Sequence, residues 1–149
     1  MSIKSRLQAD LRDALRARDE TRKSVIRLTL AELVNAEIEQ GGELDEASAG
    51  AVLQKEARKR QETITELREA NRPELLRKEE DELAILEEYV PRQLTREEIA
   101  EEAERAIEAA GATGLAQLGS VMKVLMPTLK GRADGRLANE VVRELLAGH

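Results

Sequence analysis

A cluster of basic residues lies near the carboxyl end of the chain, between Gly119 and Leu146. Its five members are Lys123, Lys130, Arg132, Arg136 and Arg143. Only Asp134, Glu140 and Glu144 oppose them, so the stretch carries a formal charge of +2 in a chain whose net charge is −6. A local excess of positive charge of this kind suits binding to a phosphate backbone or to an acidic partner.

A turn within this basic stretch places cations beside the start of a helix. Gly131 and Gly135 flank the turn and supply backbone freedom. Asp134 is positioned to accept hydrogen bonds from the first amides of the final helix. Two interpretations are open. Either the helix amides and the arginines bind an anion together, or Asp134 takes the amides and the arginines are only solvated.

The residue types in the rest of the chain argue against an active site. The sequence has no cysteine, and its single histidine is His149. No Ser-His-Asp set, phosphate-binding glycine loop or metal-ligand spacing stands out. The acidic run from Glu79 to Glu82 splays around a helix, which favours a solvated face over a metal site. We therefore expect no catalytic residue, cofactor or metal ion, and no catalysis by the chain alone.

The elements that must position the basic residues are predicted to be helices. The chain has no Phe or Trp and one Tyr, and its Leu, Ile, Val and Ala residues recur at helical spacing. This composition predicts an all-α fold. No apolar run approaches the length of about 20 residues that spans a bilayer, and the first residues lack a signal-peptide core. We therefore expect a cytoplasmic protein that does not contact a membrane.

An N-terminal domain of residues 1–90 is predicted to be a four-helix, bundle-like arrangement with two long antiparallel helices. Asp19 is expected to cap the second helix, and the third starts at Asp45 or Ser48. Pro73 starts the fourth, which runs back along the third. The predicted helices cover about residues 2–18, 19–40, 45–70 and 73–90. The apolar residues assigned to the second helix are Val25, Leu28, Leu33, Val34 and Ile38.

Two further groups of basic residues occur in this domain. The first forms a secondary basic patch of Arg12, Arg16, Lys23 and Arg27. The second lies on the third helix and consists of Lys55, Arg58, Lys59 and Arg60. Interleaved glutamates leave two interpretations of the second group: contact with phosphate, or a solvated face with ion pairs inside the helix.

A C-terminal domain of residues 91–149 is predicted to hold three short helices. The break at Pro91 marks its start, and Thr95 with Glu98 has the spacing of a capping box at the next helix. Gly111 ends that helix, and Pro127 is expected to truncate or kink the one that follows. The final helix begins after the basic turn.

Four segments together resemble the YqeY proteins, which are free-standing relatives of the C-terminal part of GatB, the B subunit of tRNA-dependent amidotransferase. The segments are IRLTLAEL with NAEI at residues 26–33 and 35–38, QKEARKRQE at 54–62, LAILEEYVPRQL at 83–94 and LKGRADG at 129–135. The resemblance covers nearly the whole chain. It implies an N-terminal helical bundle joined to a three-helix tail.

The resemblance also implies a function in tRNA metabolism. In the amidotransferase family the tail reaches the tRNA body, while a separate cradle domain, absent here, carries out the chemistry. We therefore expect a protein that binds tRNA or another structured RNA, or that assists an amidotransferase or a synthetase. Carbon–nitrogen ligase activity with glutamine as amido donor is expected only in a larger assembly. The alternative is a helical protein-interaction module that binds no RNA.

Overall fold

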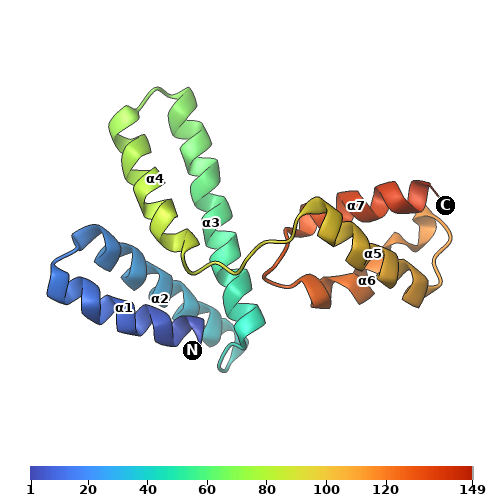
Figure 1. The fold of residues 1–149 in the computed structure, drawn as a ribbon, viewed down its shortest axis with the longest axis horizontal. Helices are drawn as coiled ribbons and strands as arrows, with labels where there is room; N and C mark the ends of the chain where they lie inside the picture. Colours follow the sequence, from blue (N-terminus) through green and yellow to red (C-terminus); the bar gives the residue numbers. More distant parts are fainter. Residues whose placement is uncertain (149) are drawn as a thin grey trace. The chain divides into compact units, whose positions relative to one another are not determined.

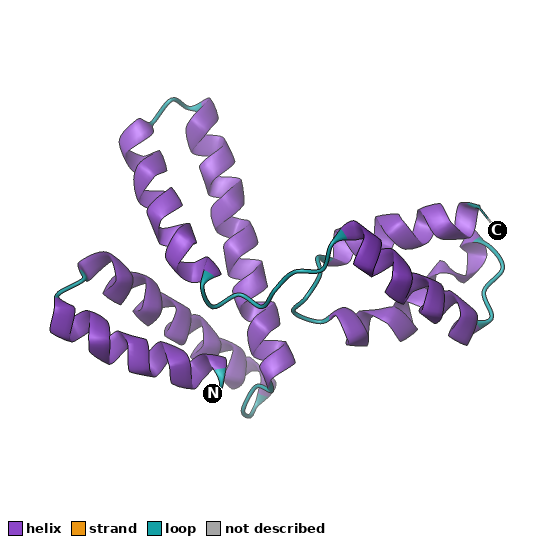
Figure 2. Ribbon diagram, viewed as in Figure 1, coloured by secondary structure: helices purple, strands orange, loops and turns teal. Residues whose placement is uncertain are grey.

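The computed structural model describes residues 1–148, and His149 lies outside them. Seven α-helices and one short 3-10 helix account for the regular structure of the described residues, which contain no strand (Figure 2). The predicted all-α class is therefore confirmed. Contacts along the chain group into two compact units, Met1–Pro91 and the residues from Arg92 onward. We refer to them as the N-terminal unit and the C-terminal unit.

The N-terminal unit consists of two helical hairpins (Figure 1). Helices α1 and α2 form the first, and α3 and α4 form the second. Their bounds are α1 Ile3–Ala17, α2 Glu20–Gln40, α3 Glu46–Glu69 and α4 Pro73–Glu87. The predicted cap at Asp19 is confirmed, because its carboxylate accepts a hydrogen bond from the amide of Arg22. Asp45 caps α3 in the same way through the amide of Ser48.

Only some of the apolar residues expected on the second helix belong to the apolar core of the N-terminal unit. Leu28, Val34 and Ile38 are 50%, 43% and 71% exposed. The buried face instead holds Val25, Ile26, Thr29 and Leu33. Thr29 is tolerated there because its hydroxyl donates a hydrogen bond of 2.7 Å to the carbonyl oxygen of Val25. The apolar residues of α2 lie on all sides of the helix, so their spacing alone did not show which face packs against the rest of the unit.

The α3–α4 hairpin contains an ion-pair cluster that corrects two predictions. The Arg60 guanidinium of α3 lies 3.2 Å from a carboxylate oxygen of Glu79 and 2.5 Å from one of Glu82, both on α4. The side chains of Arg60 and Glu82 are only 14% and 15% exposed. The acidic run is therefore not a uniformly solvated face, and Arg60 pairs between helices rather than within its own.

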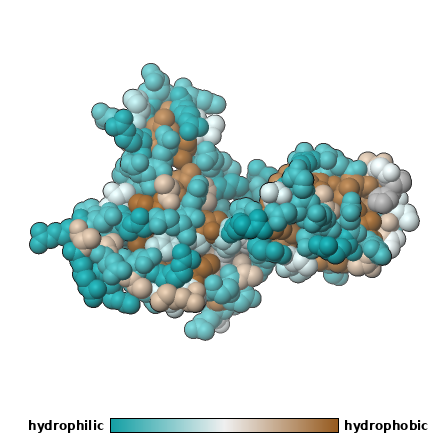
Figure 3. Space-filling view, in the orientation of Figure 1, coloured by the Kyte–Doolittle hydropathy of each residue, from teal (hydrophilic) through white to brown (hydrophobic). Residues whose placement is uncertain are grey.

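The C-terminal unit packs three α-helices around one core. They are α5 Arg96–Ala110, α6 Leu118–Leu129 and α7 Gly135–Ala147, with the 3-10 helix η1 Leu115–Gln117 before α6. The most deeply buried side chains of the core are Ile99, Ala103, Val121, Leu125, Leu129, Ala138, Val142 and Leu146. Helix α6 continues through Pro127 to Leu129, so the proline does not truncate it, and the kink stays a prediction. Hydrophilic residues dominate the face drawn in Figure 3, with hydrophobic patches between them.

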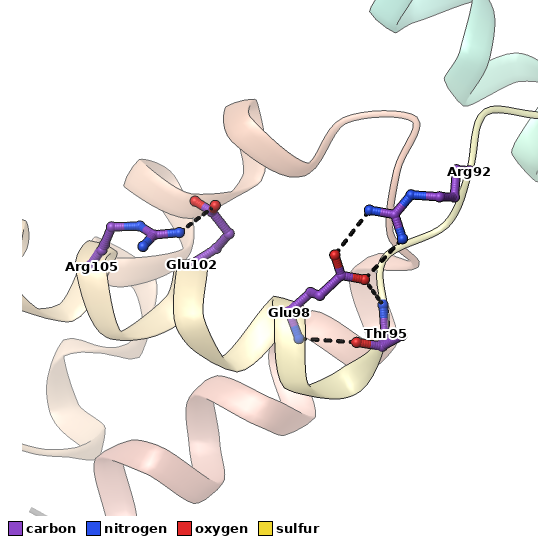
Figure 4. Close-up of polar contacts among 5 residues, drawn as sticks. All are labelled: Arg92, Thr95, Glu98, Glu102 and Arg105. Atoms are coloured by element: carbon purple, nitrogen blue, oxygen red, sulfur yellow. Dashed lines mark hydrogen bonds and ion pairs between the residues drawn. The ribbon is translucent and has the colours of Figure 1, made fainter.

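The start of α5 has the predicted capping box. The Thr95 hydroxyl accepts a hydrogen bond of 3.1 Å from the Glu98 amide, and the Glu98 carboxylate accepts one of 3.0 Å from the Thr95 amide. Arg92 adds two bonds to the same carboxylate, of 3.0 and 2.9 Å (Figure 4). The Arg92 guanidinium and the Thr95 amide together lower the pKa of Glu98 to about 2.

Candidate nucleic-acid interface

The turn between α6 and α7 is held in place by hydrogen bonds from the segment before α5. The amide of Leu94 donates to the carbonyl oxygen of Arg132 at 2.7 Å, and the side chain of Gln93 donates to that of Gly131 at 3.0 Å. Gly131 has a φ of 78°, a conformation that glycine adopts without strain. Ala133 is buried at the centre of the turn. The turn therefore has a fixed shape.

Asp134 caps α7, as the sequence predicted. Its carboxylate accepts a hydrogen bond of 2.9 Å from the amide of Arg136. This amide is therefore already bonded. The geometry agrees with the interpretation in which Asp134 takes the helix amide, and the guanidinium groups rather than the helix end are what this turn offers to an anion.

All five candidate cations of the C-terminal unit are exposed. Lys130, Arg132 and Arg136 follow one another through the α6–α7 turn, whereas Lys123 lies two turns earlier on α6 and Arg143 two turns later on α7. Arg132 donates a hydrogen bond to the carbonyl oxygen of Thr128. Among residues 92–148, the ion pairs of this unit do not include any of the five cations.

Arg136 and Arg143 share one side of α7, because seven residues make nearly two full turns. The Nε group of Arg143 donates a hydrogen bond of 2.8 Å to the Asn139 side-chain oxygen, one turn earlier. This bond fixes the direction of the guanidinium along the exposed side of the helix. Its two terminal nitrogens take no part in the bond.

The carboxylates of α7 are engaged by a residue that the sequence did not single out. Arg96, at the start of α5, lies 3.6 Å from a Glu140 oxygen and 2.5 Å from a Glu144 oxygen. Glu144 and, more weakly, Glu140 raise the pKa of the Arg96 guanidinium. A local pattern could not have revealed this contact, because Arg96 and Glu144 are 48 positions apart.

The secondary basic patch of the N-terminal unit is partly neutralised. The Arg16 guanidinium lies 3.5 Å from Asp13, and the Lys23 ammonium lies 2.6 Å from Glu20. Arg12 and Arg27 are exposed on α1 and α2. Half of this patch is therefore balanced by a carboxylate of its own helix, unlike the five cations of the C-terminal unit.

A second polar cluster, around the single tyrosine, also escaped the sequence analysis. The ring of Tyr89 is buried, and its hydroxyl donates a short hydrogen bond to the Asp10 carboxylate. The Arg6 guanidinium lies over the ring, 5.1 Å from its centre. Arg22 pairs with Glu88 at 2.9 Å. These contacts join the end of α4 to the α1–α2 hairpin, which gives the cluster a structural role.

Two other features, a metal site and a membrane-spanning helix, were also sought among the described residues. Within residues 1–148, no group of three or more His, Asp or Glu side chains is arranged to hold a metal ion. None of the helices there is both long and apolar enough to traverse a bilayer. His149, the only histidine, falls beyond the described part of the chain.

Comparisons with known proteins support the resemblance to the YqeY proteins. The family model described as Yqey-like protein matches residues 4–146. A protein of Pyrenophora tritici-repentis named "Altered inheritance of mitochondria protein 41, mitochondrial" is 31% identical over 145 residues, which cover 95% of this chain and 79% of that protein. Proteins of the same name from Lachancea thermotolerans and Saccharomyces cerevisiae are 36% and 34% identical.

These two yeast matches are shorter. They cover 56% and 58% of this chain, and 46% and 47% of the respective relatives. All three names describe mitochondrial proteins. This finding contradicts the expectation of a cytoplasmic protein, which rested only on the lack of a targeting signal in the first residues and had no positive evidence behind it.

Proposed function

The chain belongs to the Yqey-like protein family, and from that premise we propose that its C-terminal unit binds structured RNA, with tRNA as the RNA class. In this proposal the N-terminal unit is a helical bundle that carries a three-helix RNA-binding domain. One observation carries the proposal: five exposed cations take no part in the ion pairs formed among residues 92–148, in a chain whose net charge is −6. Unpaired cations of this kind suit a phosphate backbone.

The mode of binding follows from the residue types. The C-terminal unit has no aromatic residue, since the only one in the chain is Tyr89 in the N-terminal unit. Stacking on unpaired bases therefore has no platform there. Arginine and lysine contacts to phosphates, arranged by the shape of a helical RNA, are the remaining mode. Lys130, Arg132 and Arg136 would make the central contacts, because all three fall within the seven residues from Lys130 to Arg136 at the α6–α7 turn.

The proposal is tested by filter binding of the full chain to tRNA over a range of salt concentrations. Each phosphate contact on a duplex contributes about 0.9 to the slope of log affinity against log salt, so five contacts give a slope of roughly 4.5. Neutralising Lys130, Arg132 and Arg136 to glutamine should lower this slope by roughly 3. Absence of affinity at low salt, or affinity that salt does not change, would refute RNA binding.

A matched control is available on the N-terminal unit. Arg68, Arg77 and Lys78 are exposed residues of the α3–α4 hairpin, outside the five cations proposed to contact RNA and outside the two basic groups of the N-terminal unit. Changing these three to glutamine alters the net charge by the same amount. The control should keep most of the slope. If both triple variants lost affinity equally, net charge rather than the α6–α7 turn would be responsible.

Carbon–nitrogen ligase activity is proposed only for a larger assembly that contains an amidotransferase or a synthetase. The resemblance to the GatB tail supports this link. The test is glutamine hydrolysis by the purified chain, which we expect to be absent. Hydrolysis that copurifies with the chain would replace the accessory role with an enzymatic one.

A protein-interaction module is the second candidate function. It is favoured by the apolar residues that α2 leaves exposed, namely Leu28, Val34 and Ile38. Affinity capture from a cell lysate distinguishes the two candidates. A single protein recovered after nuclease treatment, and lost when Ile38 and Val34 are changed to serine, would support the interaction module. Recovery that nuclease abolishes would count against it.

A further inference from the structure

We infer that Arg96 is a positioning residue for the RNA contact, which it supports by drawing Glu140 and Glu144 away from the cations of α7. The inference rests on the proposed RNA binding. Arg96 itself points to the carboxylates and is not assigned a contact with RNA. Its ion pairs of 3.6 Å and 2.5 Å connect the start of α5 to the exposed side of α7.

The spacing on α7 shows what Arg96 prevents. Glu140 is four residues after Arg136 and three residues before Arg143. Both spacings place oppositely charged side chains next to each other on a helix, where they form ion pairs. With its carboxylate held by Arg96, Glu140 forms no pair with either arginine in the described residues. Both guanidinium groups therefore remain available to a phosphate.

Asn139 contributes to the same arrangement. It accepts a hydrogen bond of 2.8 Å from the Nε group of Arg143 and so occupies the nitrogen nearest the helix. The two terminal nitrogens, which form the planar fork that binds phosphate, take no part in this bond. An uncharged partner orients Arg143 here without neutralising it. Arg96 therefore holds the carboxylates beside the cations of α7, and Asn139 orients one of these cations.

The side chains of these ion pairs are exposed to solvent, so we expect the pairs to affect the charge near the α7 cations more than the folding stability of the unit. The side chains of Arg96, Glu140 and Glu144 are 40%, 60% and 61% exposed. Ion pairs in contact with solvent contribute little to folding free energy. A carboxylate a few ångströms from a phosphate-binding guanidinium, in contrast, directly opposes the charge that RNA requires. Loss of Arg96 should therefore change RNA affinity more than thermal stability.

The test compares Arg96→Gln with Arg105→Gln in tRNA filter binding at low salt. Arg105 is the matched control, because it lies on the same helix and pairs only within α5, with Glu102 at 2.6 Å (Figure 4). Both variants lose one positive charge. Arg96→Gln should weaken binding roughly fivefold and lower the salt slope, since Glu140 becomes free to pair with Arg136 or Arg143 and the charge of Glu144 is no longer neutralised. Arg105→Gln should change affinity less than twofold by the same electrostatic argument.

A rescue experiment distinguishes a positioning role of Arg96 from a direct contact of Arg96 with RNA. Adding Glu140→Gln and Glu144→Gln should raise affinity more in the Arg96→Gln background than in the wild-type or Arg105→Gln background. An equal increase in all three backgrounds would overturn the inference, because it would show no coupling between Arg96 and the carboxylates. If wild-type chain itself showed no salt-dependent binding, the proposed RNA function would fail first, and that result is distinguishable.

A second variant at Arg96 provides the test if Arg96→Gln does not fold. Circular dichroism and the thermal midpoint establish whether Arg96→Gln is folded. If it is not, Arg96→Lys serves, because a single ammonium pairs less well with two carboxylates than the guanidinium fork does. It should bind RNA less tightly than wild type and regain affinity with Glu140→Gln. Arg96→Lys with wild-type affinity and no response to Glu140→Gln would equally overturn the inference.

Discussion

The Tyr89 hydroxyl donates a hydrogen bond to the Asp10 carboxylate, joining the end of α4 to the middle of α1 across 79 positions of sequence. Tyr89 is 2% exposed, and Arg6 covers its ring. This contact joins the two hairpins at the edge of the apolar core, where the neighbouring side chains are charged. It is therefore the most direct probe of how the two hairpins are held together.

Replacing Tyr89 with phenylalanine should lower the free energy of unfolding by about 1 to 3 kcal/mol, because it removes a hydrogen bond to a charged group and leaves the carboxylate with one partner fewer. Urea denaturation followed by circular dichroism measures the change. Asp10→Asn keeps an acceptor oxygen and should cost less. Equal stability of Tyr89→Phe and wild type would show that the hydroxyl contributes nothing.

The ionisation of Tyr89 should be displaced to high pH. Burial, and next the bond to Asp10, raise the pKa of Tyr89 from 10.0 to about 12. A raised pKa means that the folded state favours the protonated phenol. The stabilisation is complete below pH 10 and is lost as the pH rises from about 10 to about 12. Because the chain has one tyrosine and no tryptophan, ultraviolet titration of tyrosinate reports this group alone.

Titration in concentrated urea gives the unfolded reference, where the midpoint should return to about 10. The difference in stability between wild type and Tyr89→Phe should shrink over the same interval of pH. A native midpoint near 10 would contradict the buried, hydrogen-bonded position of the phenol.

The capping box of α5 should respond to acid. Arg92 and the Thr95 amide lower the pKa of Glu98 from 4.5 to about 2. A lowered pKa means that the folded state favours the carboxylate, so the stabilisation is present above about pH 4.5 and is lost as the pH falls toward about 2. Nuclear magnetic resonance titration of the Glu98 side chain measures the midpoint. Glu98→Gln should remove this part of the pH dependence, and a midpoint near 4.5 would contradict it.

Loss of the Thr95 hydroxyl should destabilise the C-terminal unit by about 1 kcal/mol, the usual cost of removing a helix cap. Thr95→Ala is measured by urea denaturation. The matched control is Thr63→Ala on α3, where an exposed hydroxyl only donates to the Lys59 carbonyl within the helix. The control should change stability by less than about 0.5 kcal/mol. Equal effects of the two variants would contradict the capping role.

Arg60 should be more important for stability than its basic neighbours on α3. Arg60→Met leaves Glu79 and Glu82, which are 26% and 15% exposed, without their cation. The expected loss is about 1 to 3 kcal/mol, below that of a fully buried pair. Changing both glutamates to glutamine in the same chain should restore much of it. Lys59→Met, which breaks an exposed pair within α3, should cost less than about 1 kcal/mol.

Local rules identified the boundaries of the fold from the sequence. The caps at Asp19, Thr95 and Asp134 are confirmed, as is the end of α5 at Gly111. Each depends on residues within four positions, so the printed sequence contains all the information required. Of the two effects expected of Pro127, truncation does not occur. The proline removes only one amide donor near the end of α6, where Leu125 and Leu129 are buried.

The candidate site was predictable only in part. The sequence indicated which five residues give the stretch from Gly119 to Leu146 its excess positive charge, but no sequence pattern indicated the role of Arg96. The same holds for the exposed face of α2, since Leu28 and Ile26 are equally apolar and only packing distinguishes them. Pairing between distant residues depends on how helices pack, and no spacing rule encodes that.

The amino-acid sequence by itself determined the helical class, the main caps and the positions of the excess positive charge, because these follow from residue types and from interactions along a few consecutive residues. Only the tertiary structure decided which charges are neutralised. Arg96 meets Glu144, and Arg60 meets Glu82, through helices brought together by their apolar faces. Burial of those faces is a cooperative property of a whole unit, so the partners of the surface charges emerge only after it has folded.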